Sequence, residues 1–162
     1  MAEYVDTHTD TYLKSGSNEL KILEYTAGGE TYGINILKVN RVLSEMSGFT
    51  VIPEVHPAVR GVFNDHDKVI PVLDLGMFLN GTPTPIDGRY RVIVTEFFGM
   101  LNSFLVENVE TVHTFHWEQV INAQSVFENI QNPFVISIVQ PTEDQMILLL
   151  DYETIILKLI PD

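Results

Sequence analysis

Two groups of histidine and acidic residues are the places in this sequence where acid–base or metal chemistry could occur. His113 and His116 are spaced to share one face of a helical turn, with acidic residues nearby, as metal ligands would be. In the second group, Asp65-His66-Asp67, a histidine held between carboxylates could serve as a general acid or base. The apolar segments on both sides of 65–67 favour a solvated turn for this group. For His113 and His116, a strand-to-loop transition anchored by Trp117 is favoured instead. We therefore expect no metal site and no catalytic residue in either group.

Asp74 and Asp151 form a third candidate pair, because each ends an apolar run at a matching place in the chain. Such a pair indicates a shared structural role, such as capping the segment that follows, rather than a catalytic dyad. Glycine-rich phosphate loops, a G-x-S-x-G elbow and an H-E-x-x-H zinc motif are all missing from the sequence. The chain has no cysteine, which excludes disulfides, thiolate metal ligands and cysteine nucleophiles. We expect a protein that is not an enzyme and has no cofactor.

Charge and composition exclude several classes of partner. The 162 residues carry 22 acidic and 9 basic side chains, a formal net charge of −13 at pH 7. So negative a chain repels nucleic-acid phosphates and anionic lipid headgroups, and we expect neither as a partner. Hydrophobic residues make up 45% of the chain, which excludes disorder for most of it. The polar beginning of the sequence carries no secretory signal and its apolar runs are short, so we expect a cytoplasmic protein without direct membrane insertion.

Short strands separated by turns and prolines dominate the elements that would position these residues. Residues 1–16 are expected to form a flexible tail, and residues 17–162 the folded domain. Two alternating runs that begin at Leu20 and Tyr32 flank Gly28-Gly29, which predicts a β-hairpin. Further strands are expected at 61–64, 68–75, 90–96, 101–106, 135–139 and 145–150, and short helices at 37–43, 57–60 and 152–159. The class is all-β and barrel-like, since barrels hide the edges of many short strands.

The second half of the chain repeats the pattern of the first half. Ile34 begins a series of four apolar residues whose spacing recurs from Phe104, 70 residues later. The apolar run that ends at Asp74 returns in the run that ends at Asp151, 77 residues later. Two matches in the same order predict two similar β subdomains in which these positions correspond.

Several blocks of sequence, taken in order, carry a family resemblance. They are the Ser-Asn-Glu-Leu lead-in with its strand at 17–25, followed by five further segments at 32–39, 57–64, 69–75, 117–120 and 148–155. Together they span about residues 16–160 and resemble the CheW-like domain of bacterial chemotaxis adaptor proteins. The lead-in is similar to the CheV branch in particular.

This resemblance implies a non-enzymatic adaptor or scaffold that couples chemoreceptors to a histidine kinase in signal transduction. Members of the family fold into two intertwined, five-stranded, SH3-like barrels with a few short helices, which agrees with the internal repeat. Their partners are the cytoplasmic helical hairpin of a chemoreceptor and the regulatory domain of the kinase. Carried over by position, the partner-binding residues would be Ile36, Val39 and Val112, with His66 in place of a partner-contacting arginine. Apolar side chains suit the capture of a helix face, and the alternative for each is an ordinary place in the core.

The chain departs from the family pattern at two places, which keeps other functions open. The usual Asn-Leu-Arg-Gly loop is here the acidic 64–67, where His66 lacks the donor fork of an arginine, and the usual Val-Asp-x-Val is 106–109. One alternative is therefore a divergent CheW-like module with altered receptor or kinase coupling that acts as an auxiliary binding protein. Another is a β-barrel that binds a small ligand, for which the sign would be a deep pocket with convergent ionisable groups. The receiver domain that follows in CheV proteins has no counterpart pattern in these residues.

Overall fold

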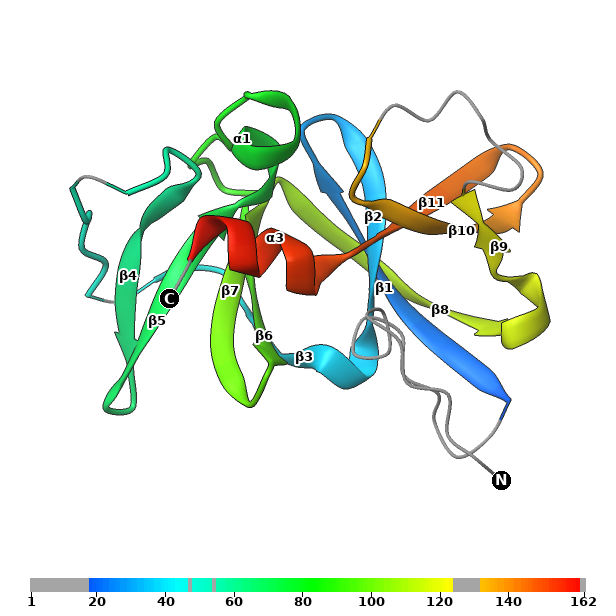
Figure 1. Ribbon diagram of the computed structural model, residues 1–162, viewed down its shortest axis with the longest axis horizontal. Coiled ribbons are helices and arrows are strands. Elements are labelled where there is room, and N and C mark those ends of the chain that lie inside the picture. Colours follow the sequence, from blue (N-terminus) through cyan, green and yellow to red (C-terminus); the bar gives the residue numbers. More distant parts are fainter. Residues whose placement is uncertain (1–17, 47, 54, 124–131, 161–162) are drawn as a thin grey trace.

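β-Strands arranged in two sheets make up most of the computed structural model, which describes residues 18–46, 48–53, 55–123 and 132–160 (Figure 1). The expected tail at 1–16 lies outside these ranges. The first sheet has the order β8-β1-β2-β11-β10-β9, and the second has the order β3-β6-β7-β5-β4. The strands of the first are β1 (Glu19–Ala27), β2 (Glu30–Asn35), β8 (Asn108–His116), β9 (Ile121–Asn122), β10 (Val135–Thr142) and β11 (Gln145–Leu150). Those of the second are β3 (Val39–Leu43), β4 (Val59–Asp65), β5 (Lys68–Asp74), β6 (Arg91–Phe97) and β7 (Met100–Val106).

The same succession of elements occurs in both halves of the chain. The hairpin β1–β2 is followed by the 3-10 helix η1 (Ile36–Lys38) and by β3, which leaves the first sheet to pair with β6 of the second. The hairpin β6–β7 is followed by β8, which crosses in the opposite direction to pair with β1. β4 and β5 lead into helix α1 (Leu75–Asn80), as β10 and β11 lead into helix α3 (Tyr152–Leu159). Each half of the chain thus contributes strands to both sheets, and the two barrels are intertwined.

The pairing register confirms the internal repeat. Leu23 lies opposite Ile34 in the first hairpin, and Ile93 lies opposite Phe104 in the second, so each partner is displaced by 70 residues. The parallel ladder of β5 with β7 places Leu73 beside Phe104. In the parallel ladder of β11 with β2, Leu149 lies beside Gly33, which is the equivalent register one residue earlier. The two halves therefore fold as the sequence pattern predicts.

Asp74 and Asp151 have the matched capping role that their positions predict. The Oδ1 atom of Asp74 accepts the backbone N–H of Met77, in the first turn of α1, at 3.2 Å. The Oδ1 atom of Asp151 accepts the backbone N–H of Thr154, in the first turn of α3, also at 3.2 Å. Each aspartate satisfies one of the amides that a helix leaves without a partner at its start, which fixes where the helix begins.

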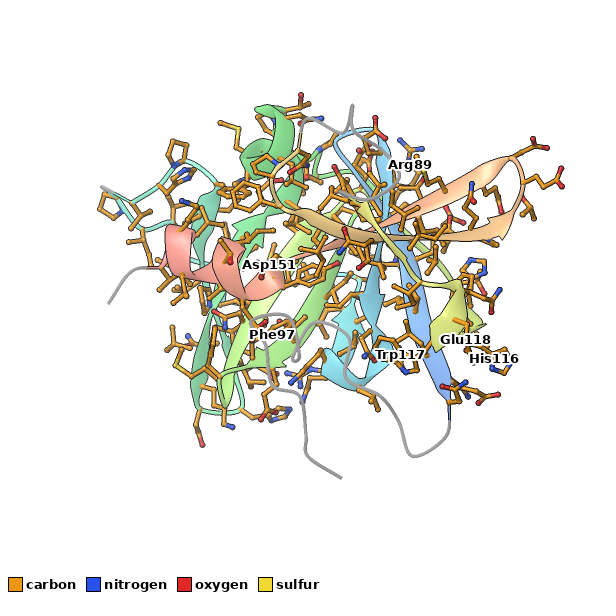
Figure 2. The ribbon with its side chains drawn as sticks, turned by 45° about the vertical axis from the view of Figure 1, so that its right-hand side comes forward. Arg89, Phe97, His116, Trp117, Glu118 and Asp151 are labelled. Carbon is orange, nitrogen blue, oxygen red and sulfur yellow. The ribbon has the colours of Figure 1, made fainter. Side chains whose placement is uncertain are left out.

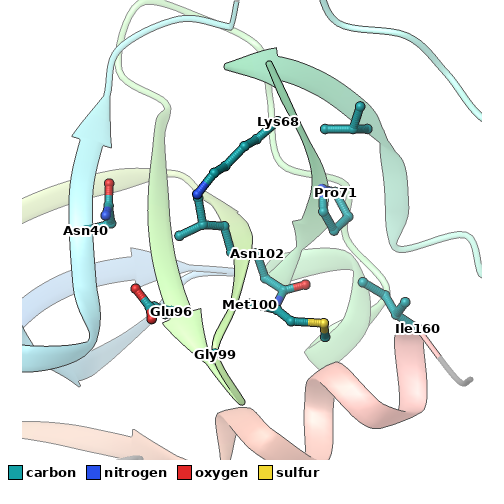
Figure 3. Close-up of a pocket in the computed structure, with 10 residues that line it drawn as sticks. Asn40, Lys68, Pro71, Glu96, Gly99, Met100, Asn102 and Ile160 are labelled. Atoms are coloured by element: carbon teal, nitrogen blue, oxygen red, sulfur yellow. The ribbon is translucent and has the colours of Figure 1, made fainter. Parts of the chain in front are cut away.

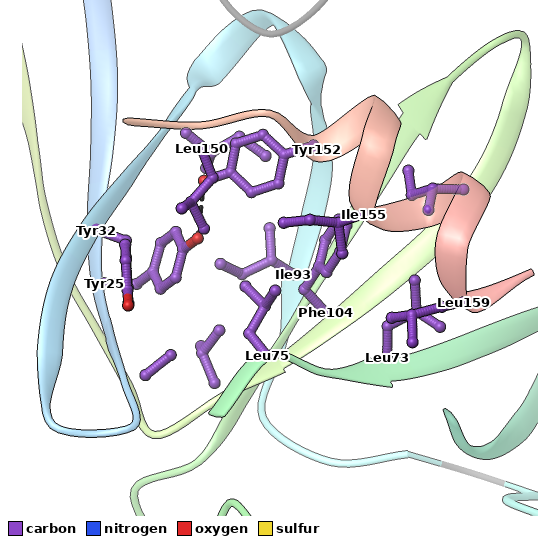
Figure 4. Close-up of a cluster of buried hydrophobic side chains, with 14 of the residues drawn as sticks. Tyr25, Tyr32, Leu73, Leu75, Ile93, Phe104, Leu150, Tyr152, Ile155 and Leu159 are labelled. Carbon is purple, nitrogen blue, oxygen red and sulfur yellow. Dashed lines mark hydrogen bonds between the residues drawn. The ribbon is translucent and has the colours of Figure 1, made fainter. Parts of the chain in front are cut away.

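The largest core cluster lies between the two sheets and includes two buried tyrosines, Tyr25 and Tyr152, that contact each other (Figure 4). The hydroxyl of Tyr152 donates to the carbonyl of Gly33 at 2.6 Å, so the hydroxyl of Tyr25, 2.7 Å away, is the donor in their mutual hydrogen bond. Smaller clusters that include Ile22 and Phe63 fill the two barrel interiors. Helix α3 thus fastens the central core to a carbonyl of β2.

Two of the three expected helices are wrong. Residues 37–43 form the end of η1 and strand β3, where β-branched side chains favour the extended ladder with β6. Residues 57–60 lead through a turn into β4. The helix at 152–159 is confirmed, and α1 was not expected, because its six residues continue an apolar strand without a turn signal. Strand β8 was also not expected as an element. Among the described residues, no helix has the length and apolar character required to cross a membrane.

Candidate functional site

Exposed apolar side chains lie on each of the two strands that cross between the sheets, β3 and β8. Val112 of β8 lies opposite Leu23, and Val42 of β3 lies opposite Ile93, which is the same relationship in the two halves. Residues directly opposite each other in an antiparallel pair point to the same face of the sheet. Leu23 and Ile93 belong to the central core, so each valine lies at the margin of that face. Val112 is 46% exposed and Val42 is 39% exposed, so both margins are open to solvent.

The other two residues expected at this site are less accessible. Ile36 and Val39 are partly buried and pack against the central core. Leu37, between them in the sequence, is 54% exposed and was not expected to take part. The signal that would have found Val42 is the alternation along β3, which a helical interpretation of 37–43 obscured, whereas Leu37 lies in η1 outside that alternation. We call Leu37, Val42 and Val112, with the half-buried Ile36 and Val39, the β3–β8 rim.

The start of this rim is set by a local cap. The Oδ1 atom of Asn35 accepts the backbone N–H of Leu37 at 2.9 Å, which ends β2 and begins the 3-10 turn. The Lys38 ammonium lies 5.5 Å from the centre of the Phe97 ring, within reach of a cation–π contact. These contacts fix the turn at both ends and leave the Leu37 side chain pointing away from the core.

His66 lies at the tip of the β4–β5 hairpin and is 92% exposed on its side chain. His66 and Asp67 form the two-residue turn and adopt positive φ angles of 48° and 71°, a conformation for which glycine is favoured. The expectation of a wholly solvated turn is wrong for Asp65. Its side chain is 20% exposed and forms an ion pair with Arg41 of β3. The exposed His66 and Asp67 are therefore held on a base that is tied to the β3–β8 rim.

The histidines at the other end of the molecule do not build a metal site. His113 lies within β8, rather than in a strand-to-loop transition, and its Nε2 atom is 2.6 Å from Glu24 Oε1 on β1. His116 ends β8 and precedes the 3-10 helix η2 (Trp117–Gln119), next to Trp117 and Glu118 (Figure 2). Within the described ranges, no group of three histidine or acidic residues is arranged to hold a metal ion.

The second departure from the family pattern is structural in this chain. Glu107, at the junction of β7 and β8, accepts the backbone N–H of Gly29 through its Oε1 atom at 2.7 Å. Its own backbone N–H donates to the carbonyl of Thr26 at 2.9 Å. Glu107 thus fastens the start of the crossing strand β8 to the turn of the first hairpin. Its side chain is one methylene longer than the aspartate of the family pattern, and it contacts the Gly29 N–H at this turn.

An ion pair to a buried carboxylate distinguishes the first half of the chain from the second. The Arg60 Nη1 atom lies 2.7 Å from Asp74 Oδ2, and Asp74 is wholly buried. Thr84 donates to the same carboxylate from its backbone N–H at 2.9 Å and from its hydroxyl at 2.6 Å. These contacts tie the loop between α1 and β6 to the start of α1. The residue that corresponds to Arg60 in the other half is Ile136, by the registers of β4 and β10.

Two cavities at equivalent places in the halves differ in charge. One of about 600 Å³ lies between the starts of β5 and β7 and the end of α3, and is lined by Lys68, Glu96 and Asn102 among others (Figure 3). Its counterpart of about 340 Å³ lies beside the turn of the first hairpin and the start of β11, and includes Glu30 and Asp144. The two halves therefore present one surface of mixed charge and one that is acidic.

The chain is similar to chemotaxis proteins in sequence and in fold. The CheW-like domain model matches residues 21–159. "Chemotaxis protein CheW" of Bacillus subtilis is 25% identical over 148 residues, a match that covers 90% of each chain. "Chemotaxis protein CheV3" of Helicobacter pylori is 29% identical over 127 residues, which cover 77% of this chain and 40% of CheV3. This chain thus spans less than half of that relative.

A solved structure agrees with the architecture described above. The scaffolding protein TtCheW from Thermoanaerobacter tengcongensis superposes with a TM-score of 0.72 at 28% identity, over 81% of this chain and 88% of that one. The family model covers all the strands that build both barrels, apart from the first residues of β1. The chain therefore belongs to the CheW-like domain family.

Proposed function

We propose that this protein is a cytoplasmic, non-enzymatic adaptor that couples chemoreceptors to a histidine kinase in bacterial chemotaxis. The observation that carries the proposal is the pair of exposed valines, Val42 and Val112, at equivalent places on the two strands that cross between the barrels. What sets these two valines apart from the other exposed apolar residues is their equivalent placement beside the core on the two crossing strands. The names of the similar proteins support chemotaxis as the process in which this surface is used.

The β3–β8 rim is proposed to bind the cytoplasmic helical hairpin of a receptor. A helix presents apolar side chains at i, i+3 and i+4, and the rim supplies exposed Leu37, Val42 and Val112 with Ile36 and Val39 beneath them. His66 is proposed to contact the kinase regulatory domain from the tip of its hairpin. Because His66 offers fewer donors than an arginine, this second contact is expected to be weaker than in relatives that carry the Asn-Leu-Arg-Gly loop.

The acidic turn favours one alternative function, an auxiliary module that binds the receptor but couples weakly to the kinase. Asp67 and the ion-paired Asp65 flank His66, so a partner with an acidic surface would be repelled there. The two functions differ in one property: the adaptor binds both partners at once, whereas the auxiliary module binds the receptor alone.

Co-sedimentation with receptor-bearing membranes, with and without the kinase, tests the proposal. The wild-type chain is expected to sediment with the membranes and to increase the amount of kinase that sediments. Val112→Asp places a charge on the rim and is expected to reduce sedimentation at least about tenfold, as the loss of an interface hot spot would. Ile86→Asp, at an exposed apolar residue of the loop between α1 and β6, is the matched control and should leave sedimentation unchanged. Equal losses in both variants, or binding that survives Val112→Asp, would contradict the assignment of the rim.

A further inference from the structure

An apolar cavity of about 540 Å³ lies between β4, the segment before it and the end of α3. It is lined by Ile52 and Val55 of that segment, by Val59 and Val62 of β4, and by Leu159 of α3. This volume lies within the range of small-molecule sites, about 300–1,000 Å³. The cavity is separate from the β3–β8 rim and shares no residue with it.

The internal repeat gives Val62, which lines this cavity, a more deeply buried counterpart in the other half. By the registers of β4 with β5 and of β10 with β11, Val62 corresponds to Ile138 and Pro71 to Leu148. Ile138 is wholly buried and Leu148 packs against the central core, whereas Val62 remains partly exposed within the cavity. The two halves share the strand pairing at this place, but the apolar side chain at the position of Val62 is more exposed than the one at Ile138.

Two basic residues, His56 and Lys158, are the charged or titratable side chains that line the cavity in the described part of the chain. The Nδ1 atom of His56 accepts the backbone N–H of Ala58 at 3.0 Å, and the ring lies 5.9 Å from the ring of Phe78. Because Nδ1 is an acceptor, the neutral ring carries its proton on Nε2 and offers a donor there. Neither Nε2 nor the Lys158 ammonium has a partner among the described residues. A positioned donor and a cation thus border an apolar cavity in a chain whose net charge is −13.

We infer that this cavity binds a small amphipathic carboxylate, that is, an aliphatic or aromatic carboxylic acid of low molecular mass. Its apolar body would lie over Val59 and Val62, and its carboxylate would accept hydrogen bonds from His56 Nε2 and Lys158. Hydrogen bonds between a charged acceptor and a cationic donor are about twice as strong as neutral ones, so the headgroup decides which apolar molecules bind. The inference is independent of the adaptor function, since it concerns another surface.

Titration of the full chain with decanoate, followed by methyl NMR, tests the inference. Shifts are expected at the methyl groups of Val59, Val62 and Leu159 and not at Val112. Decanoate is expected to bind at least about tenfold more tightly than decanol or decylamine, which carry the same tail with a neutral or a positive headgroup. Equal binding of the three compounds, shifts confined to other surfaces, or no shifts at millimolar decanoate would each overturn the proposal.

Charge variants at exposed lysines separate the headgroup contact from general electrostatics. Lys158→Gln is expected to reduce the preference for decanoate over decanol to within about twofold. Lys21→Gln removes the same charge from an exposed position on β1 and is expected to leave that preference unchanged. Both substitutions lie on the surface and preserve the fold, which thermal unfolding verifies. An equal effect of the two substitutions would show that net charge alone attracts the ligand, and would overturn the site.

Discussion

Arg60 contacts the Asp74 carboxylate at 2.7 Å. In the other half of the chain, Asp151 corresponds to Asp74, and Ile136 stands at the position that corresponds to Arg60. The two aspartates cap their helices in the same way, and Asp74 also pairs with a guanidinium and holds a loop through Thr84. One capping device has thus acquired a second use in one half of the fold. The asymmetry makes the two positions unequal in energy.

Replacing each aspartate by alanine measures this difference. Asp151→Ala removes a helix cap and is expected to lower the free energy of unfolding by about 1–2 kcal/mol. Asp74→Ala also removes the carboxylate that Arg60 and both Thr84 donors contact, and is expected to cost more, about 2–4 kcal/mol, because the buried Thr84 donors are left unpaired. Urea unfolding of the two variants gives both values. Similar losses at the two positions would mean that the Arg60 contact contributes little.

Alkaline unfolding is expected to depend on the buried tyrosines. Burial raises the pKa of Tyr25 and Tyr152 well above 10 and that of Tyr32 to about 12. Above pH 10 the unfolded chain loses phenolic protons that the folded protein retains, so the free energy of unfolding falls as pH rises from 10 towards 12. Below pH 10 these groups add no pH dependence. Urea unfolding at a series of alkaline pH values measures the slope.

Tyr152→Phe provides the control for this slope. The variant removes one of the buried phenols, so its free energy of unfolding should fall less steeply as the pH rises. At neutral pH its free energy of unfolding is expected to be lower by about 1–3 kcal/mol, because Gly33 and Tyr25 lose a hydrogen-bond partner. An unchanged slope would assign the pH dependence to other groups.

The turn at His66 and Asp67 offers a substitution that separates stability from binding. Asp67→Gly places glycine at a φ of 71°, and its effect on stability is expected to stay within about 1 kcal/mol, because relief of strain and added freedom of the unfolded chain offset each other. His66→Arg combined with Asp67→Gly restores the basic, glycine-closed turn, and is expected to tighten binding to the kinase with little shift in melting temperature. Binding measured at two salt concentrations tests this, because a new charge contact weakens as salt increases. Unchanged binding to receptor and kinase would exclude the turn as a contact surface.

Gly61 in β4 is expected to tolerate no side chain. It adopts a φ of 149°, and a Cβ atom there would lie 2.1 Å from the carbonyl oxygen of Thr50. Thr50 and Val62 exchange two backbone hydrogen bonds of 2.8 and 2.9 Å, so Gly61→Ala must displace the segment before β4. A loss of at least about 2 kcal/mol in urea unfolding is expected. Gly88→Ala, where the added atom meets open space, is the control and should be nearly neutral.

The repeat was predictable from the sequence because apolar spacing reports the pairing of strands directly. Ile34 and Phe104 occupy equivalent positions in their ladders, and the caps at Asp74 and Asp151 follow from the same pattern. β3 was not predictable in this way, since its spacing of Val39 and Val42 fits a helical turn as well as a strand. Only its partner β6, which lies more than 50 residues further along the chain, decides between the two.

The candidate site was predictable in part for a related reason. Apolar residues at 36, 39 and 112 were identified from position in a family pattern, which does not report burial, and the structure exposes Val112 more than the other two. Asp65 appeared to belong to a solvated turn because its partner Arg41 lies on another strand. Long-range contacts of this kind leave no local signal in the sequence.

The crossing of β3 and β8 has a consequence for how the molecule can be divided. Each sheet combines strands of both halves: β3 of the first half pairs along β6 of the second, and β8 of the second half pairs along β1 of the first. A fragment that contains one half alone would lack strands of both sheets and would expose part of the central core. The two fragments made by cutting the loop between α1 and β6 should therefore remain unfolded separately, and regain structure only when they are mixed. The two barrels are thus expected to fold in one step. The rate of that step should be limited by the pairing of strands that lie far apart in the chain.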